Sequence, residues 1–236
     1  MPPSTQTLIS SMTDFVTDYM SDHDPSHNLA HIHRVVHLAQ TILKSEQTLS
    51  PTTTPYDSTI VTLSALLHDI GDRKYLPPST STSNNNNPNP QTAVQQALLE
   101  AGADDSLAAR VQTIVSNVSY TNETKDPEKV RRLIDEEGYR ELAIVQDADR
   151  LDAIGAVGIG RCFTFLGAQG KKHVAPGGEW VMDGAIEHFV EKLERLEGMM
   201  KTETGKRMAR VRTERLRVFR GWWEEETGFR AEAGTV

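Results

Sequence analysis

Apolar residues recur with the 3.6-residue period of an α-helix along most of this 236-residue chain. No segment shows the sustained alternation of polar and apolar residues that marks a β-strand. The pattern predicts helices over residues 28–44, 60–70, 92–100, 107–118, 141–157, 185–200 and 206–226. Segment 60–70 is apolar on nearly every side, so we expect it at the centre of the fold. The sequence therefore predicts an all-α protein, and it contains no internal repeat.

A chain of this length is expected to form a single domain with a full core. We divide it into an N-terminal helical segment 1–23, a main domain 24–226 and a C-terminal tail 227–236. Residues 77–90 are rich in Ser, Asn and Pro and cannot build a core, so they are predicted to form a mobile loop on the surface. A lid over a nearby site is the alternative for that loop. Residues 45–58 are also predicted to be a loop.

Charge and composition exclude several classes of protein. The net charge of −8 argues against general nucleic-acid binding, which needs a basic surface. No apolar run approaches the ~20 residues that span a bilayer, and residues 1–13 lack the pattern of a secretion signal. Because Cys162 is the only cysteine, neither an intrachain disulfide nor a cluster of thiolate ligands can form. We therefore expect a cytoplasmic protein without a membrane partner.

The placement of the histidines indicates where chemistry can occur. His31 lies at the edge of the apolar arc of its helix, whereas His33 and His37 lie on the polar face and are predicted to be ordinary surface residues. His68 and Asp69 end the most apolar helix of the chain. Burying an imidazole and a carboxylate there is costly unless each is paired or bound to a metal. The sequence thus favours a functional site at that helix end, with a close partner or a metal for each of the two side chains.

A second source of carboxylates is the stretch 146–152, which is flanked by apolar residues. Asp149 and Asp152 share one helical face, and Asp147 lies on the opposite face. In a regular helix Asp147 and Asp149 cannot both point at one centre, and spacing alone leaves open which of them is the ligand. Asp147 and Asp152 are alternatively residues that brace the site. Asp147 could equally be a structural carboxylate paired with an arginine such as Arg161.

Four ordered stretches resemble the HD-domain superfamily of metal-dependent phosphohydrolases, and within it the small, single-domain YedJ-like branch. They are residues 26–35, 65–70, 146–156 and 191–205, and the resemblance covers about 24 to 226. It implies a single-domain helical HD bundle that binds a divalent metal through His31, His68, Asp69 and Asp149. Asp149 is implied because it belongs to an Ala-Asp-Arg-Leu string. The chain departs from the branch at Asn28, where Asp is usual, so the role of His27 stays open.

The resemblance implies hydrolysis of a phosphoester or phosphoanhydride, with a nucleotide as the expected substrate of a nucleotidase or nucleotide pyrophosphohydrolase. Two imidazoles and two carboxylates suit a divalent ion, for which Mn²⁺ is our first choice and Mg²⁺, Co²⁺, Ni²⁺ and Fe²⁺ are alternatives. Two-metal HD sites recruit extra histidines between the His-Asp pair and the last Asp. Because no histidine stands between Asp69 and Asp149, we expect one metal ion.

Other residues near these stretches are candidates for handling the substrate. Arg34 and Lys74 could neutralise the charge that develops on phosphoryl oxygens, and His27 could join them in binding the substrate. Asp72 is the candidate for activating water or orienting a ligand. For Arg34, Lys74 and Asp72, an ordinary surface ion pair is the alternative.

Two other functions fit the same resemblance. One is a non-catalytic module that senses a nucleotide or a metal; the intact set of implied ligands argues against it. The other is an HD-type diiron oxygenase, which the absence of the middle histidines disfavours. As to partners, the adjacent Trp222 and Trp223 cannot both face one core, so one of them is a candidate contact in a homodimer.

Overall fold

The computed structural model describes residues 3–21, 23–49, 56–70, 91–172, 174 and 178–231, and within these residues it is helical with no strand, as predicted. The helices are α1 (Thr5–Tyr19), α2 (Leu29–Leu49), α3 (Ser58–Leu67), α4 (Ala93–Glu100), α5 (Asp105–Val115), α6 (Tyr120–Lys125), α7 (Pro127–Asp135), α8 (Glu141–Asp152), α9 (Gly155–Gln169), α10 (Asp183–Glu191) and α11 (Glu203–Thr227), with 3₁₀ segments η1 (Gly170–Lys172) and η2 (Leu193–Met199). The all-α prediction is confirmed.

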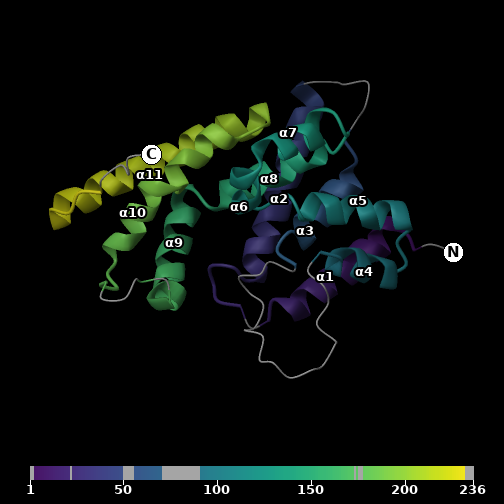
Figure 1. Ribbon diagram of the computed structural model, residues 1–236, viewed down its shortest axis with the longest axis horizontal. Coiled ribbons are helices and arrows are strands. Elements are labelled where there is room, and N and C mark those ends of the chain that lie inside the picture. Colours follow the sequence, from purple (N-terminus) through teal and green to yellow (C-terminus); the bar gives the residue numbers. More distant parts are fainter. Residues whose placement is uncertain are drawn as a thin grey trace.

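Helices α2, α3 and α8 form the centre of the molecule and pack against one another. On one side lie α1, α4 and α5, and on the other α9 and α10 lie beneath the long α11 (Figure 1). One apolar cluster joins α2 and α8 to α10 and α11, with Phe189 and Leu216 among its members. A second joins α1, α3, α4 and α5, with Val16 and Leu63 among its members. Every residue of α8 except Asp149 is buried, so this helix passes through the core.

The observed helices differ from the predicted ones at their ends. Helix α2 continues to Leu49, so the prediction of a loop from residue 45 is wrong. Glu46, in the last turns of this helix, is buried and accepts a hydrogen bond from the backbone N–H of Thr204. This contact with a residue far along the chain stabilises the end of α2, and no local sequence pattern reveals it. The predicted helix 141–157 is two helices, because the chain turns at Ile154 and Gly155, where the glycine has φ +75°.

The C-terminal helices and two short ones also depart from prediction. The predicted helix 185–200 is α10 followed by the 3₁₀ segment η2. Helices α6 and α7 were not predicted: α6 buries no residue, and α7 buries only Val130 and Leu133, so neither has a long apolar period.

No single described helix is long and apolar enough to cross a membrane; α8 with α9 and η1 meets those criteria only as a pair bent by 69°. The predicted loop 77–90 lies outside the described residues.

Candidate metal centre

The candidate site forms where α2 passes the end of α3. His31 is on the buried side of α2, where it is 1% exposed. Asp57 caps the start of α3 by accepting hydrogen bonds from the first backbone N–H groups, and His68 caps its end. Because the helix ends at Leu67, the consecutive side chains of His68 and Asp69 can both turn toward His31.

Four polar side chains meet at this point. The Nε2 atoms of His31 and His68 are 3.1 Å apart. Each of them lies 3.4 Å from a carboxylate oxygen of Asp69 and 3.7 Å from Oδ1 of Asp149. The ligand atoms of His31, His68 and Asp69 all lie within 4.8 Å of one another, a spacing that could hold a metal ion. The structure thus brings together the four residues that the resemblance implied as ligands.

Hydrogen bonds at the far side of each ring fix which nitrogen faces the centre. Nδ1 of His68 lies 2.8 Å from the carbonyl oxygen of Ala65, and Nδ1 of His31 lies 2.8 Å from Oδ2 of Asp152. Both partners are acceptors, so both Nδ1 atoms donate, and each ring in its neutral form presents a lone pair at Nε2. Two lone pairs 3.1 Å apart repel unless a positive charge lies beside them.

The carboxylate of Asp69 completes a set of donors that fits a divalent cation. Its Oδ2 atom is buried and has no hydrogen-bond partner among the described residues. Burial acts to raise the pKa of Asp69, but the imidazoles of His68 and His31 hold that pKa below its usual range. An ionised, buried oxygen beside two imidazole lone pairs is the environment in which a protein ligates a metal.

Asp152 holds His31 in place and is itself held by two arginines. Its Oδ1 accepts from Nε of Arg34 at 2.7 Å, and its Oδ2 accepts from Nη2 of Arg34 and Nη1 of Arg161, both at 3.0 Å. Burial would raise the pKa of Asp152, but the hydrogen bonds from His31 and Arg34 lower it well below its usual range. Burial also acts to lower the pKa of His31, yet the hydrogen bond to Asp152 and the nearby Asp69 carboxylate leave it raised. The surroundings therefore favour positive charge at this point.

The HD-domain family model matches residues 28–154, a range that includes all four of the converging side chains. This chain belongs to the HD-domain family.

Relatives of this HD-domain chain agree with the assignment. YpgQ from Bacillus subtilis is 37% identical over 182 residues, which are 77% of this chain and 75% of YpgQ. The crystal structure of YpgQ in complex with ADP matches with a TM-score of 0.66 at 30% identity, covering 95% of this chain and 97% of YpgQ. An HD-superfamily hydrolase from Bacillus thuringiensis matches with a TM-score of 0.64 at 26% identity, covering 96% of this chain and all of that one. A protein from Lactobacillus plantarum shares the fold, with a TM-score of 0.69 at 24% identity over 96% of this chain and 98% of its own.

Asp147 points away from the candidate metal centre. It is fully buried, and its carboxylate accepts hydrogen bonds from Oγ1 of Thr202 at 2.7 Å and from the backbone N–H groups of Thr202 at 2.8 Å and Lys201 at 3.0 Å. Burial raises the pKa of Asp147, and these hydrogen bonds counter that effect. The predicted pairing of Asp147 with Arg161 is wrong, because Arg161 reaches Asp152 from α9.

The remaining candidates divide into one placed beside the centre and two outside the described residues. The ring of His27 lies 5.9 Å from that of His31, and burial, with the Arg161 charge as the next cause, lowers the pKa of His27 to about 4. Asp72 and Lys74 lie outside the described residues.

His33 is exposed, as predicted. Sequence patterns missed Phe165 of α9, whose ring lies 5.7 Å from that of His27, because nothing in the sequence of α9 links it to α2.

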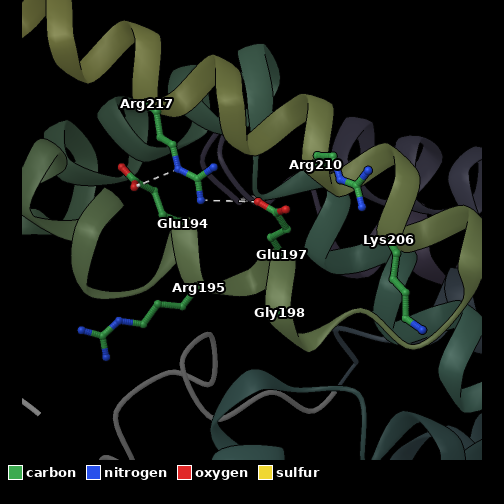
Figure 2. A pocket seen from close by; sticks show the side chains of 7 residues that line it. All are labelled: Glu194, Arg195, Glu197, Gly198, Lys206, Arg210 and Arg217. Carbon is green, nitrogen blue, oxygen red and sulfur yellow. Dashed lines mark hydrogen bonds and ion pairs between the residues drawn. The ribbon is translucent and has the colours of Figure 1, made fainter.

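A groove elsewhere on the protein is distinct from the metal centre. It has a volume of about 440 Å³ and lies between η2 and α11. Figure 2 shows that Arg217 reaches across it to both Glu194 and Glu197, which neutralises the acidic side chains there. With its main carboxylates already paired, this groove offers no cluster of metal ligands comparable to that at His31.

Proposed function

We propose that this protein is a metal-dependent phosphohydrolase that cleaves a phosphoester or phosphoanhydride of a nucleotide, as a nucleotidase or a nucleotide pyrophosphohydrolase. The observation that carries the proposal is the convergence of two imidazole lone pairs and the Asp69 carboxylate on one point in a chain of the HD-domain family. The crystal structure of YpgQ with ADP supports a nucleotide as the ligand. A nucleoside diphosphate offers both a phosphoester and a phosphoanhydride for hydrolysis.

The ligands in this proposal are His31, His68, Asp69 and Asp149, holding one divalent ion, with Mn²⁺ as the first choice. The distances of 3.4 and 3.7 Å from the imidazoles to the two carboxylates support this set, because small side-chain movements would bring all four within bonding reach of a single ion. When bound, a divalent cation polarises a phosphoryl oxygen and lowers the pKa of water at the site.

The other residues orient the centre and meet the substrate. Asp152 fixes the His31 ring so that Nε2 faces inward, and Arg34 and Arg161 fix Asp152. The Arg34 side chain remains 34% exposed, which supports a second role in which it approaches the phosphate. His27, with its low pKa, is neutral near pH 7 and would contribute hydrogen bonding or stacking rather than charge. Lys74 and Asp72 complete the proposal as the phosphate-binding cation and the group that orients water.

The test is a hydrolysis screen over nucleoside mono-, di- and triphosphates with Mn²⁺, Mg²⁺, Co²⁺ and Ni²⁺. We expect activity with at least one pair of nucleotide and metal, and release of phosphate or pyrophosphate identifies the bond that is cleaved. His68→Ala and Asp69→Ala should each reduce the rate by about 1,000-fold or more, because the ion supplies most of the stabilisation of the developing charge. Activity that survives in both variants would reject the metal mechanism.

A matched control comes from the same helix as His31. His33→Ala removes an exposed imidazole from the opposite side of α2 and should leave activity unchanged. Titration of ADP in the presence of Mn²⁺ separates catalysis from sensing: binding without turnover of any nucleotide would favour the non-catalytic module. The metal content separates the hydrolase from the diiron alternative, which requires two redox-active ions.

A further inference from the structure

Helix α11 leaves one of its faces uncovered. Its inner side packs against α8, α9 and η2, and the helix runs along the edge of the molecule (Figure 1). On the opposite side Val211 is 53% exposed, Val218 is 41% exposed and Trp222 is 60% exposed. At 100° per residue these three side chains fall within about 40° of one another. Single exposed apolar residues are ordinary, but three aligned along one helix form a line of apolar contacts, flanked between Val211 and Val218 by the exposed Glu214 and Arg215.

Charged residues stand at the two ends of this line. Arg207 is on the same face before Val211, and Glu225 is on it after Trp222; both are exposed. Neither forms an ion pair with a described residue of the chain. We call Arg207, Val211, Val218, Trp222 and Glu225 the outer strip of α11. It is basic at its beginning, apolar in the middle and acidic at its end.

Four of the five positions in the outer strip, all except Glu225, are symmetric about the point between Glu214 and Arg215. Val211 and Val218 lie about 5 Å along the axis on either side of that point, and Arg207 and Trp222 lie about 11 Å on either side, at 1.5 Å per residue. A two-fold axis through that point would therefore set Val211 against Val218 of a second copy. It would also bring Trp222 beside Arg207 of the second copy, where a guanidinium can stack on the indole face.

We propose that the outer strip of α11 is the interface of a symmetric homodimer, in which two copies of the chain pair through antiparallel α11 helices. Parallel pairing would oppose Arg207 to Arg207 and Glu225 to Glu225, whereas antiparallel pairing brings each arginine toward the glutamate of the other copy. The surface is self-complementary, as the interface of a two-fold dimer must be. The inference is independent of the proposed hydrolysis, because none of these residues lies at the metal centre.

Gly221 agrees with a close approach of a second helix. A glycine inside a helix costs up to ~1 kcal/mol relative to alanine. A Cβ atom added at Gly221 would meet no atom of the described residues within 4 Å, so packing inside the chain does not require the glycine. The missing side chain leaves room beside Trp222 for the backbone of the second copy. One helix pair covers less than the ~800 Å² per partner of a standard interface, so we expect a dimer that dissociates at micromolar concentrations.

The test is sedimentation equilibrium of the full chain across concentrations, with charge exchange along the strip. Arg207→Glu alone and Glu225→Arg alone should each weaken the dimer at least about tenfold, because each opposes like charges at both ends of the pair. An equal mixture of the two variants should regain nearly the wild-type association. In the mixed dimer both ends again pair opposite charges. A wild-type chain that remains monomeric, or a mixture as weak as its components, would overturn the proposal.

Removal of the tryptophan tests the apolar part of the same surface. Trp222→Ser should weaken the dimer at least about tenfold, as loss of a large aromatic contact at an interface does. Met182→Ser is the matched control, because Met182 is 64% exposed but lies before α10, outside the strip. Circular dichroism of all the variants checks that the helices are retained. Equal effects of the two serine substitutions would contradict the assignment of the interface to α11.

Discussion

Asp147 and Asp152 are both buried carboxylates of α8, yet their surroundings differ. Every interaction of Asp147 is with the start of α11, where it accepts from Thr202 and Lys201. Asp152 lies on the opposite face of α8 and orients the His31 ring. As a result, the Nε2 atom of His31 faces the Nε2 atom of His68. The first surroundings supply donors to both oxygens of the Asp147 carboxylate, whereas the second leave several acceptors directed at one point. Burial of charge alone therefore does not mark a functional site; unsatisfied acceptors that converge do.

The other carboxylates around the start of α11 are also paired. Glu123 pairs with both Arg150 and Lys201, and Glu46 accepts from the backbone of Thr204. These contacts fasten α11 to α2, α6 and α8. At the metal centre, by contrast, Oδ2 of Asp69 has no hydrogen-bond partner among the described residues. We infer that the start of α11 is a structural clamp and that the other end of α8 carries the chemistry.

The largest effect should come from Asp149→Asn. This change removes a carboxylate whose Oδ1 lies 3.7 Å from both imidazoles while keeping its shape. We expect metal affinity to fall by about 1,000-fold, or ~4 kcal/mol, because an anionic ligand is lost. Since Asp149 is 29% exposed and serves no other described contact, the free energy of unfolding without metal should change by less than ~0.5 kcal/mol. Calorimetric titration with Mn²⁺ and urea unfolding measure the two quantities.

Asp147→Asn should give the opposite result. The new amide group would face N–H donors of Thr202 and Lys201, so part of a buried network loses its acceptor. We expect the free energy of unfolding to fall by about 3 kcal/mol, while the folded fraction still binds one metal ion. Urea unfolding and metal analysis of the purified variant check this. If Asp147→Asn instead abolished metal binding in a stable protein, the assignment of the two aspartates would be reversed.

Some features of the fold and of the metal centre could be predicted from the sequence. The apolar period predicted the core helices, and the burial cost of His68 and Asp69 predicted that they need a partner. The family resemblance singled out Asp149 where helical spacing left Asp147 open, and the structure turns Asp147 to the opposite side. The hydrogen-bond partners of Asp147 and Asp152 could not be predicted from the sequence, because they come from segments far away along the chain. The helical period carries no information about which helices meet. For the same reason the alternative in which Asp147 pairs with an arginine such as Arg161 is wrong.

Asp152→Asn should have an intermediate effect on the metal centre. The asparagine can still accept from Nδ1 of His31, but it loses the charge that holds Arg34 and Arg161. We expect metal affinity to fall by about 10–100-fold, as for other residues that orient a ligand. At saturating Mn²⁺ the hydrolysis rate should recover, which distinguishes this variant from Asp149→Asn. A rate that stays low at every metal concentration would place Asp152 in contact with the reacting groups instead.

The smallest effect should come from Gly205→Ala, which tests the clamp without removing a polar atom. A Cβ atom at position 205 would collide with the Asp147 carboxylate and crowd Oγ1 of Thr202. We expect a loss of about 1–2 kcal/mol in the free energy of unfolding, because a buried, hydrogen-bonded group must move. Gly198→Ala is the control, since its Cβ atom would meet no described atom within 4 Å. In an Asp147→Ala background the cost of Gly205→Ala should shrink, because the collision partner is gone. Strict additivity of the two changes would mean that the carboxylate does not require glycine at position 205, and the presence of Gly205 at the start of α11 would need another explanation.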